Sequence, residues 1–491
     1  MGAALPSAKC YVAAVAAVTS VLSPTILTSA SATGSSVEVS SCSASWNIDA
    51  GDSEDGCIDE GPQAVDMVEG LGVATLEQIR EHRRLNKPLL VRLQVADWAT
   101  DDMTSIKKAL RWLRKKNIKV ARSSELIFNG GNGCGPQQNV GAFVNRTQFR
   151  ETRPLNAEPP YMFSRKILNS TELGRLFPGI RSAEGPLANE SLQAQEGVSP
   201  SSVDPSDTLK EFNWADTILM LGAAGSGAGI HEHDEAASGL LVGMKHWVLW
   251  PNQNTPKGGN PSDHYIGQWF RAIRPQEKPK RRYEVKQQAG DILYVPEGFF
   301  HGVLNLKDSL AIAFQRSTPR PLEETTSIKK TYLAKSLGKQ EKVRRLEAAF
   351  AQGSTEAAHL LSQLHAKDGD FELAIEWDRK VIEADETYLT AHAQLGVLLA
   401  QAGRPQEGLA HLLEAQRDGN IGGNFSVNLR KEVIKILSEY QVTGEGADPE
   451  EAAAALTSAR SFASEAYISE CEHLRSAFFH GFVRAAAVNE W

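Results

Sequence analysis

The chain has no surplus of basic residues and, beyond its first thirty or so positions, no long hydrophobic run. Lysine and arginine number 52 against 60 aspartates and glutamates, so the formal net charge is -8. Binding to nucleic acid through the phosphates needs an excess of positive charge, and a bilayer-spanning helix needs about 20 consecutive apolar residues. We therefore expect an ordinary globular protein, with no nucleic-acid partner and no span in the body of the chain.

Residues 1–32 have a different composition from the rest. Lys9 precedes an apolar run over residues 11–27, and Ala30-Ser31-Ala32 supplies the small residues of a signal-peptidase site. This pattern predicts a cleaved signal peptide, with no stable membrane span left after cleavage. The alternative is a membrane anchor, although several polar residues and a proline interrupt the run. The expected location is the secretory pathway, either the endoplasmic reticulum lumen or the outside of the cell.

Cysteine is scarce, with five in the whole chain. Removal of the leader leaves an even number, compatible with two disulfides in an oxidising compartment: Cys42, Cys57, Cys134 and Cys471. Their pairing cannot be deduced from sequence, and free buried thiols remain an alternative for the last two. Four glycosylation triplets agree with a lumenal location, at Asn145, Asn169, Asn189 and Asn424.

The composition changes several times along the chain. Residues 33–74 are rich in serine, glycine and acidic residues and predict an acidic low-complexity arm. A β-rich domain is expected over residues 75–318, with a disordered insertion at 182–207. Its strand-like blocks are separated by turn residues and indicate a sandwich or barrel: 217–221, 239–242, 246–250, 292–295 and 309–314.

Beyond residue 318 the sequence becomes rich in alanine, leucine and glutamate. Residues repeat at an offset of 34 positions, pairing Leu361 with Leu395 and Gly369 with Gly403. That period is typical of tetratricopeptide repeats, so residues 319–420 are predicted to form TPR-like helices that recruit a protein partner. The alternative is an amphipathic helical tail packed on the barrel. Residues 421–491 predict further helices, which would dock intramolecularly or make a dimer contact.

The strongest chemical signal lies in two separate segments. If His231 and His233 occupy a strand, their two-residue spacing places both imidazoles on one face while Glu232 points away. His301 follows a second strand and a tight aromatic turn. Neutral imidazole is a good ligand for first-row metals, and three of them leave coordination positions open for oxygen and a substrate.

Both segments resemble known sequences. GAGIHEHDEAASGLLVGMKHWVLWP (residues 227–251) and GDILYVPEGFFHGVLNL (residues 290–306) are similar to the two metal motifs of the JmjC-domain branch of the cupin superfamily, particularly its small lumenal members. The resemblance covers roughly residues 87–317. It implies a double-stranded β-helix (a cupin or JmjC jelly roll) with flanking helices, followed by an all-α region.

The resemblance also implies an Fe(II)- and 2-oxoglutarate-dependent oxygenase that acts on a protein or peptide. Carried over by position, His231, His233 and His301 would bind iron, and Lys245 would pair with the C5 carboxylate of 2-oxoglutarate. Asn305 falls where similar proteins have a polar residue lining the pocket. No catalytic residue beyond these metal and co-substrate ligands is expected.

One position departs from the family pattern. His233 stands where most active members have an acidic residue, so the metal site gains one unit of positive charge and loses an oxygen ligand. Asp234 would need a bulge in the strand to replace the missing carboxylate. Two alternatives stay open: a catalytically silent scaffold whose helical repeats recruit partners, and a three-histidine dioxygenase without a co-substrate. The histidines could also be structural, and Lys245 a solvated strand residue.

Overall fold

The structure is a computed structural model of the chain. It describes residues 62–122, 137–145, 159–165, 167–179, 216–258, 264–277, 282–315 and 327–415, with a few positions at 322–325 and 432–436. The expected leader, the four remaining cysteines, the insertion at 182–207 and nearly all of 421–491 lie outside these residues. Within the described part, no helix has both the length and the apolar character needed to cross a membrane.

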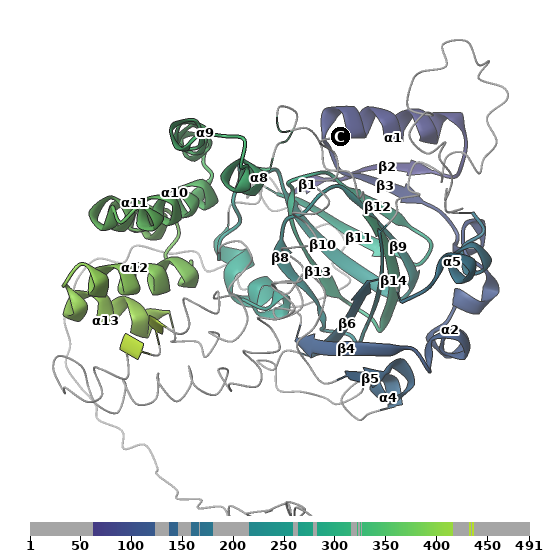
Figure 1. Cartoon of the computed structure of the whole chain (residues 1–491). Helices are drawn as coiled ribbons and strands as arrows, with labels where there is room; N and C mark the ends of the chain where they lie inside the picture. Colours follow the sequence, from purple (N-terminus) through teal and green to yellow (C-terminus); the bar gives the residue numbers. More distant parts are fainter. Residues whose placement is uncertain are drawn as a thin grey trace, which may run out of the picture. The chain divides into compact units, whose positions relative to one another are not determined.

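Two facing sheets form a jelly roll (Figure 1). In the described residues, the smaller sheet has the order β1-β11-β10-β13-β8 and the larger β2-β3-β12-β9-β14-β7-β6-β4-β5. From β7 to β14 the chain therefore alternates between the sheets, except that β10 and β11 are antiparallel neighbours in the smaller sheet, and this is the winding of a double-stranded β-helix. These strands are β7 (Asp216–Gly222), β8 (Gly227–His231), β9 (Ala236–Val242), β10 (Met244–Trp250), β11 (Tyr283–Gln288), β12 (Ile292–Val295), β13 (Phe300–Asn305) and β14 (Ser309–Gln315).

Strand β14 is buried on both of its faces. Leu310, Ile312 and Phe314 belong to the core outside the larger sheet, whereas Ala311 and Ala313 belong to the core between the two sheets. Successive side chains of a strand point to opposite faces, so an uninterrupted apolar run is what a strand between two cores requires. The sequence expectation of a strand at residues 309–314 is met here.

Flanking elements cover the outer face of the larger sheet. They contribute Ile79, Leu113, Phe143 and Leu176 to the outer core, and Figure 1 shows α1, α2 and α5 on that side. The described elements that precede β7, including the outer strands of both sheets, are β1 (Gln63–Ala64), β2 (Asp66–Glu69), α1 (Val73–Leu85), β3 (Leu89–Arg92), η1 (Val95–Asp97), η2 (Asp101–Met103), α2 (Ile106–Leu113), β4 (Asn117–Arg122), β5 (Gln137–Asn139), α4 (Val140–Asn145), β6 (Pro160–Arg165) and α5 (Ser170–Leu176).

The folded region starts earlier than the sequence indicated. Strands β1 and β2 lie inside the segment expected to be an arm, and each pairs in parallel with a strand of a main sheet. Their side chains are mostly exposed, so they carry little hydrophobic signal. Backbone pairing with β11 and β3 organises them instead.

Helices follow the jelly roll. Their bounds are α8 (Ile328–Leu333), α9 (Lys339–Ala351), α10 (Thr355–Lys367), α11 (Phe371–Ala384), α12 (Leu389–Gln401) and α13 (Pro405–Glu414). Gly369 and Gly403, paired by the 34-residue offset, have φ angles of 79° and 78° and lie between the helices of each pair. A Cβ at Gly408 would lie 2.5 Å from the Gly396 carbonyl oxygen, so α12 and α13 approach closely. The tetratricopeptide interpretation stays a prediction.

These helices are bonded to the connection between β10 and β11. That connection includes α7 (Ile266–Gln268), η6 (Trp269–Ile273) and η7 (Arg274–Gln276). The Glu356 amide donates to Thr255 Oγ1 at 3.2 Å, and the Gly258 amide donates to Asp385 Oδ2 at 2.8 Å. The helices are therefore held against this connection, and the amphipathic-tail alternative also stays a prediction.

Candidate metal centre

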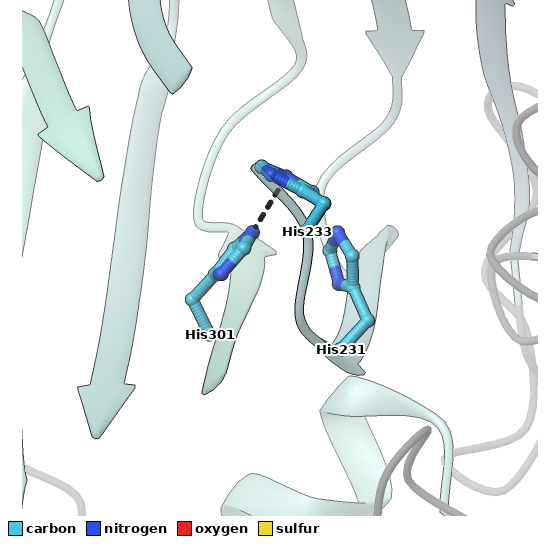
Figure 2. Close-up of side chains that lie close together, drawn as sticks. All are labelled: His231, His233 and His301. Atoms are coloured by element: carbon cyan, nitrogen blue, oxygen red, sulfur yellow. Dashed lines mark hydrogen bonds between the residues drawn. The ribbon is translucent and has the colours of Figure 1, made fainter. Parts of the chain in front are cut away.

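Three histidines from two adjacent strands meet at one end of the jelly roll. His231 ends β8 and pairs in register with His301 of β13, and His233 follows two residues after His231. The ring centroid of His231 lies 4.3 Å from that of His301 and 5.2 Å from that of His233. Figure 2 shows the three rings converging, with one nitrogen from each within 4.8 Å of the others.

Backbone carbonyls orient all three rings. His231 Nδ1 donates to Gly229 O and His301 Nδ1 donates to Phe299 O, both at 2.8 Å, and His233 Nδ1 donates to its neighbour's carbonyl at Asp234. A carbonyl oxygen only accepts, so the proton of each neutral ring sits on Nδ1 and the Nε2 lone pair is left for a ligand. Outer contacts of this kind fix the tautomer of metal-binding histidines.

The spacing between two Nε2 atoms fits a shared cation. His233 Nε2 and His301 Nε2 are 3.0 Å apart, the contact drawn as a dashed line in Figure 2. With both protons on Nδ1, two lone pairs would face each other there. Two nitrogens at right angles about a metal, each roughly 2.1 Å from it, would be about 3.0 Å apart. The donor set therefore fits a first-row metal ion.

Burial keeps these imidazoles in the form that binds metal. It lowers the pKa of His231 to about 4, the pKa of His233 to about 3 and the pKa of His301 well below its ordinary value. At neutral pH the rings are uncharged, and metal binding need not displace protons from them.

The neighbouring carboxylates point elsewhere. Asp234 pairs with Lys330 of α8, and Glu232 Oε1 accepts a hydrogen bond from Ser327 Oγ at 3.4 Å. Neither belongs to the group of potential ligands found among the described residues. The carboxylate substitute considered from the sequence, Asp234, is thus engaged by an ammonium group.

Lys245 lies inside the barrel as a buried cation. It is 1% exposed and pairs in register with Asn305, four residues beyond His301 on β13. Its Nζ donates to Tyr161 Oη at 3.4 Å, and no carboxylate of the described residues pairs with it. Burial lowers the pKa of Lys245 to about 7. Because a buried ammonium is costly without a counter-charge, this position favours an anionic ligand.

Asn305 continues the polar surface beside Lys245. Its Nδ2 donates to Ser226 Oγ at 2.9 Å, while its buried Oδ1 has no hydrogen-bond partner in the described part of the chain. Tyr161 adds a phenol whose pKa is raised by burial. Sequence reasoning missed Tyr161 and Ser226, since neither lies in a recognisable motif and only strand register brings them here.

Gly222 leaves room for this polar group, which we call the Lys245 pocket (Lys245, Asn305, Ser226 and Tyr161). A Cβ at Gly222 would lie 2.2 Å from Ser226 Oγ and 2.5 Å from Tyr161 Cδ2. Gly222→Ala is therefore expected to lower the free energy of unfolding by about 1 to 3 kcal/mol and to weaken anion binding in the pocket.

Urea unfolding and calorimetric titration with 2-oxoglutarate would measure both effects of Gly222→Ala. Gly174→Ala in α5 is the matched control, because nothing lies within 4 Å of its added Cβ. Equal stability and ligand affinity for the two variants would contradict the proposed role of Gly222.

Comparison with known proteins identifies the domain that carries these residues. No family model matches the chain. It is 34% identical over 94 residues to human JmjC domain-containing protein 8, covering 19% of this chain and 35% of that protein. It is 31% identical over 115 residues to Arginine-specific demethylase JMJ22 of Arabidopsis thaliana, covering 21% of this chain and 22% of that protein. The chain is thus similar to JmjC-domain proteins, which supports a JmjC domain here.

A longer and more distant match covers about half of the chain. The chain is 22% identical over 270 residues to Bifunctional arginine demethylase and lysyl-hydroxylase psr-1 of Caenorhabditis elegans, covering 51% of this chain and 60% of that protein. The chain thus spans between about a fifth and three fifths of the length of these relatives. The predicted JmjC resemblance and jelly-roll fold are confirmed.

Proposed function

We propose that this JmjC-domain protein is an Fe(II)- and 2-oxoglutarate-dependent oxygenase that hydroxylates a protein or peptide side chain in the secretory pathway. The observation that carries the proposal is Lys245, a buried cation without a carboxylate partner in the described residues, inside the barrel that holds three converging imidazoles. Two relatives are named as an arginine demethylase and as a bifunctional demethylase and lysyl-hydroxylase, which supports oxidative chemistry on a protein side chain.

Each residue has a defined task in this proposal. His231, His233 and His301 would hold Fe(II), which when bound supplies the oxidative chemistry with 2-oxoglutarate as co-substrate. The Lys245 ammonium would donate to the far carboxylate of 2-oxoglutarate, a charge-assisted hydrogen bond. His301 and Asn305 are four residues apart on β13, about 13 Å along the strand, so the two sites face one interior. Trp247 and Val303 line the interval between them and exclude water.

Charge balance is consistent with a dianionic co-substrate. Three neutral imidazoles leave the two positive charges of Fe(II) uncompensated, and Lys245 adds a third. A dicarboxylate would offset two of these charges at the two positions where they lie. An acidic ligand in place of His233 would neutralise one of these positive charges, and the attraction between the site and the co-substrate would be weaker.

Turnover by the full chain tests the proposal. The protein would be produced in a eukaryotic secretory host, loaded anaerobically with Fe(II), and assayed for bound iron and for conversion of 2-oxoglutarate to succinate. Stoichiometric iron with succinate formation is the expected result. Iron without succinate would contradict the oxygenase, and oxygen consumption that needs no 2-oxoglutarate would favour the three-histidine dioxygenase. A decrease in the apparent mass of the purified protein after treatment with an N-glycosidase would support its entry into the lumen.

His233 favours a second candidate, a silent JmjC scaffold. We expect His233→Asp to retain iron, because an aspartate oxygen is also a good ligand for Fe(II), and to change the rate of succinate formation. If the wild type forms succinate, and His233→Asp forms it at the same or a lower rate, the result supports the enzyme. If only His233→Asp forms succinate, the natural residue silences the site. That result would support the scaffold, in which the helices recruit a partner or residues 421–491 make a dimer contact.

A further inference from the structure

Helix α8 contacts the segment that carries His233. Its N-cap residue, Ser327, accepts a hydrogen bond from the Lys330 amide at 3.2 Å and donates its hydroxyl to Glu232 Oε1 at 3.4 Å. One turn later, Lys330 Nζ pairs with Asp234 Oδ1. The residues on both sides of His233 are therefore held by α8, a helix beyond the end of the jelly roll.

Lys330 also reaches the turn that leads to His301. Its Nζ pairs with Glu297 Oε1, a carboxylate that is 1% exposed and also accepts from Thr325 Oγ1 at 3.0 Å. In the same turn the Gly298 amide donates to the carbonyl oxygen of His233 at 3.1 Å. A single ammonium group thus joins the loop that carries His233 to the turn that precedes the strand of His301.

We propose that Lys330 is a positioning residue of the metal centre. It ties residues 232–235, here called the first metal loop, to residues 296–298, the second metal loop, and so sets the distance between the two Nε2 atoms that share the cation. It also pairs with Asp234, the acid next to His233 in the sequence, and thereby maintains a three-histidine site. This inference rests on the metal-binding part of the proposed function and not on turnover.

The physical reason lies in the two carboxylates. Asp234 and Glu297 both lie within ion-pair distance of one nitrogen atom, so without that nitrogen two like charges face each other in a partly buried place. Their repulsion would push the first metal loop away from the second. Alternatively, Asp234 would be released towards the metal. Either response changes the coordination of a bound ion.

Co(II) binding by the full chain tests the inference, because the visible absorption of Co(II) reports its ligands and geometry. Lys330→Met is expected to weaken Co(II) binding at least roughly 10-fold, the scale of losing an outer-shell partner, and to alter the absorption bands. Lys330→Arg should restore most of the affinity, since a guanidinium can also join two carboxylates. Lys329→Met removes the same charge from an exposed neighbour that disfavours positive charge at His231, so this variant should bind Co(II) at least as tightly as the wild type does.

The possible results separate this inference from the oxygenase proposal. Lys330→Met with the affinity and spectrum of Lys329→Met would overturn the positioning role. A wild-type chain that binds no Co(II) would overturn the metal centre and this role together. A wild-type chain that binds Co(II) and, when loaded with Fe(II), forms no succinate would refute only the oxygenase.

A double variant keeps the test decisive if Lys330→Met folds poorly. Adding Asp234→Asn removes one of the two opposed charges, so the double variant should fold and bind Co(II) more tightly than Lys330→Met alone. Circular dichroism would report the fold of each variant. A double variant that binds no better than a well-folded single variant would contradict the repulsion on which the inference depends.

Discussion

Replacement of His301 by alanine is expected to abolish tight binding of a first-row metal ion. His301 is the ligand on β13, the strand that follows the second metal loop, and its Nε2 lies 3.0 Å from that of His233. The loss should exceed the roughly 10- to 100-fold that removal of an outer-shell partner costs, because His231 and His233 alone would supply only two nitrogens from one segment.

Titration with Fe(II) or Co(II) by calorimetry would measure the effect of His301→Ala. His246→Ala is a suitable control, since this histidine pairs with Glu284 on the other face of β10, outside the metal group. Metal affinity lost equally in both variants would point to a general disturbance of the smaller sheet. If His301→Ala retained the metal affinity of the wild type, His301 would not be a metal ligand.

Lys245→Met is expected to have two effects of opposite sign. Methionine fills a similar volume without burying an ammonium, so the variant without ligand should be more stable than the wild type at pH 7. The same change removes a charge-assisted hydrogen bond to a carboxylate, so affinity for 2-oxoglutarate should fall by roughly 10- to 100-fold. A solvated strand lysine, the alternative weighed from the sequence, would show neither effect.

The stability difference between wild type and Lys245→Met should depend on pH in a defined window. Burial lowers the pKa of Lys245 to about 7, whereas an unfolded lysine keeps a pKa of about 10.4. Between these values the unfolded chain binds one more proton than the folded one, so the stability of the wild type rises with pH. The advantage of Lys245→Met should therefore be largest below pH 7 and shrink towards pH 10.

Urea unfolding of both proteins across this pH range, with and without 2-oxoglutarate, would measure these effects. Lys286→Met, on an exposed position of β11, provides the control with the same charge change. Saturating 2-oxoglutarate should stabilise the wild type and Lys286→Met far more than Lys245→Met. A pH-independent difference between wild type and Lys245→Met would argue against burial of the charge.

Sequence patterns predicted the inner jelly-roll strands well because those strands are apolar on both faces. The blocks expected at 292–295 and 309–314 coincide with β12 and β14 to within a residue. The family motifs likewise carried His231, His233 and His301, and the structure brings these together. Both signals are local, in that each depends on residues close together in the sequence.

Features that depend on distant pairing could not be read in this way. Tyr161 reaches Lys245 because β6 pairs with β7 across more than fifty intervening residues. Lys330 meets Asp234 across a still longer separation in the sequence, and nothing in the helical pattern of α8 distinguishes Lys330 from Lys329. Strands β1 and β2 were missed because their exposed side chains carry no alternation, and their pairing partners are set elsewhere in the chain.

The hydrogen bonds between the helices and the connection after β10 bear on how the jelly roll can be isolated. A fragment that stops at residue 318, where the sequence indicated a boundary, would lack Asp385 and Glu356, the partners of the Gly258 amide and of Thr255. It would also lack Ser327 and Lys330. The shortest unit fit for crystallisation or enzymology should therefore run through α13, and a recombinant product trimmed to the jelly roll would be an incomplete protein.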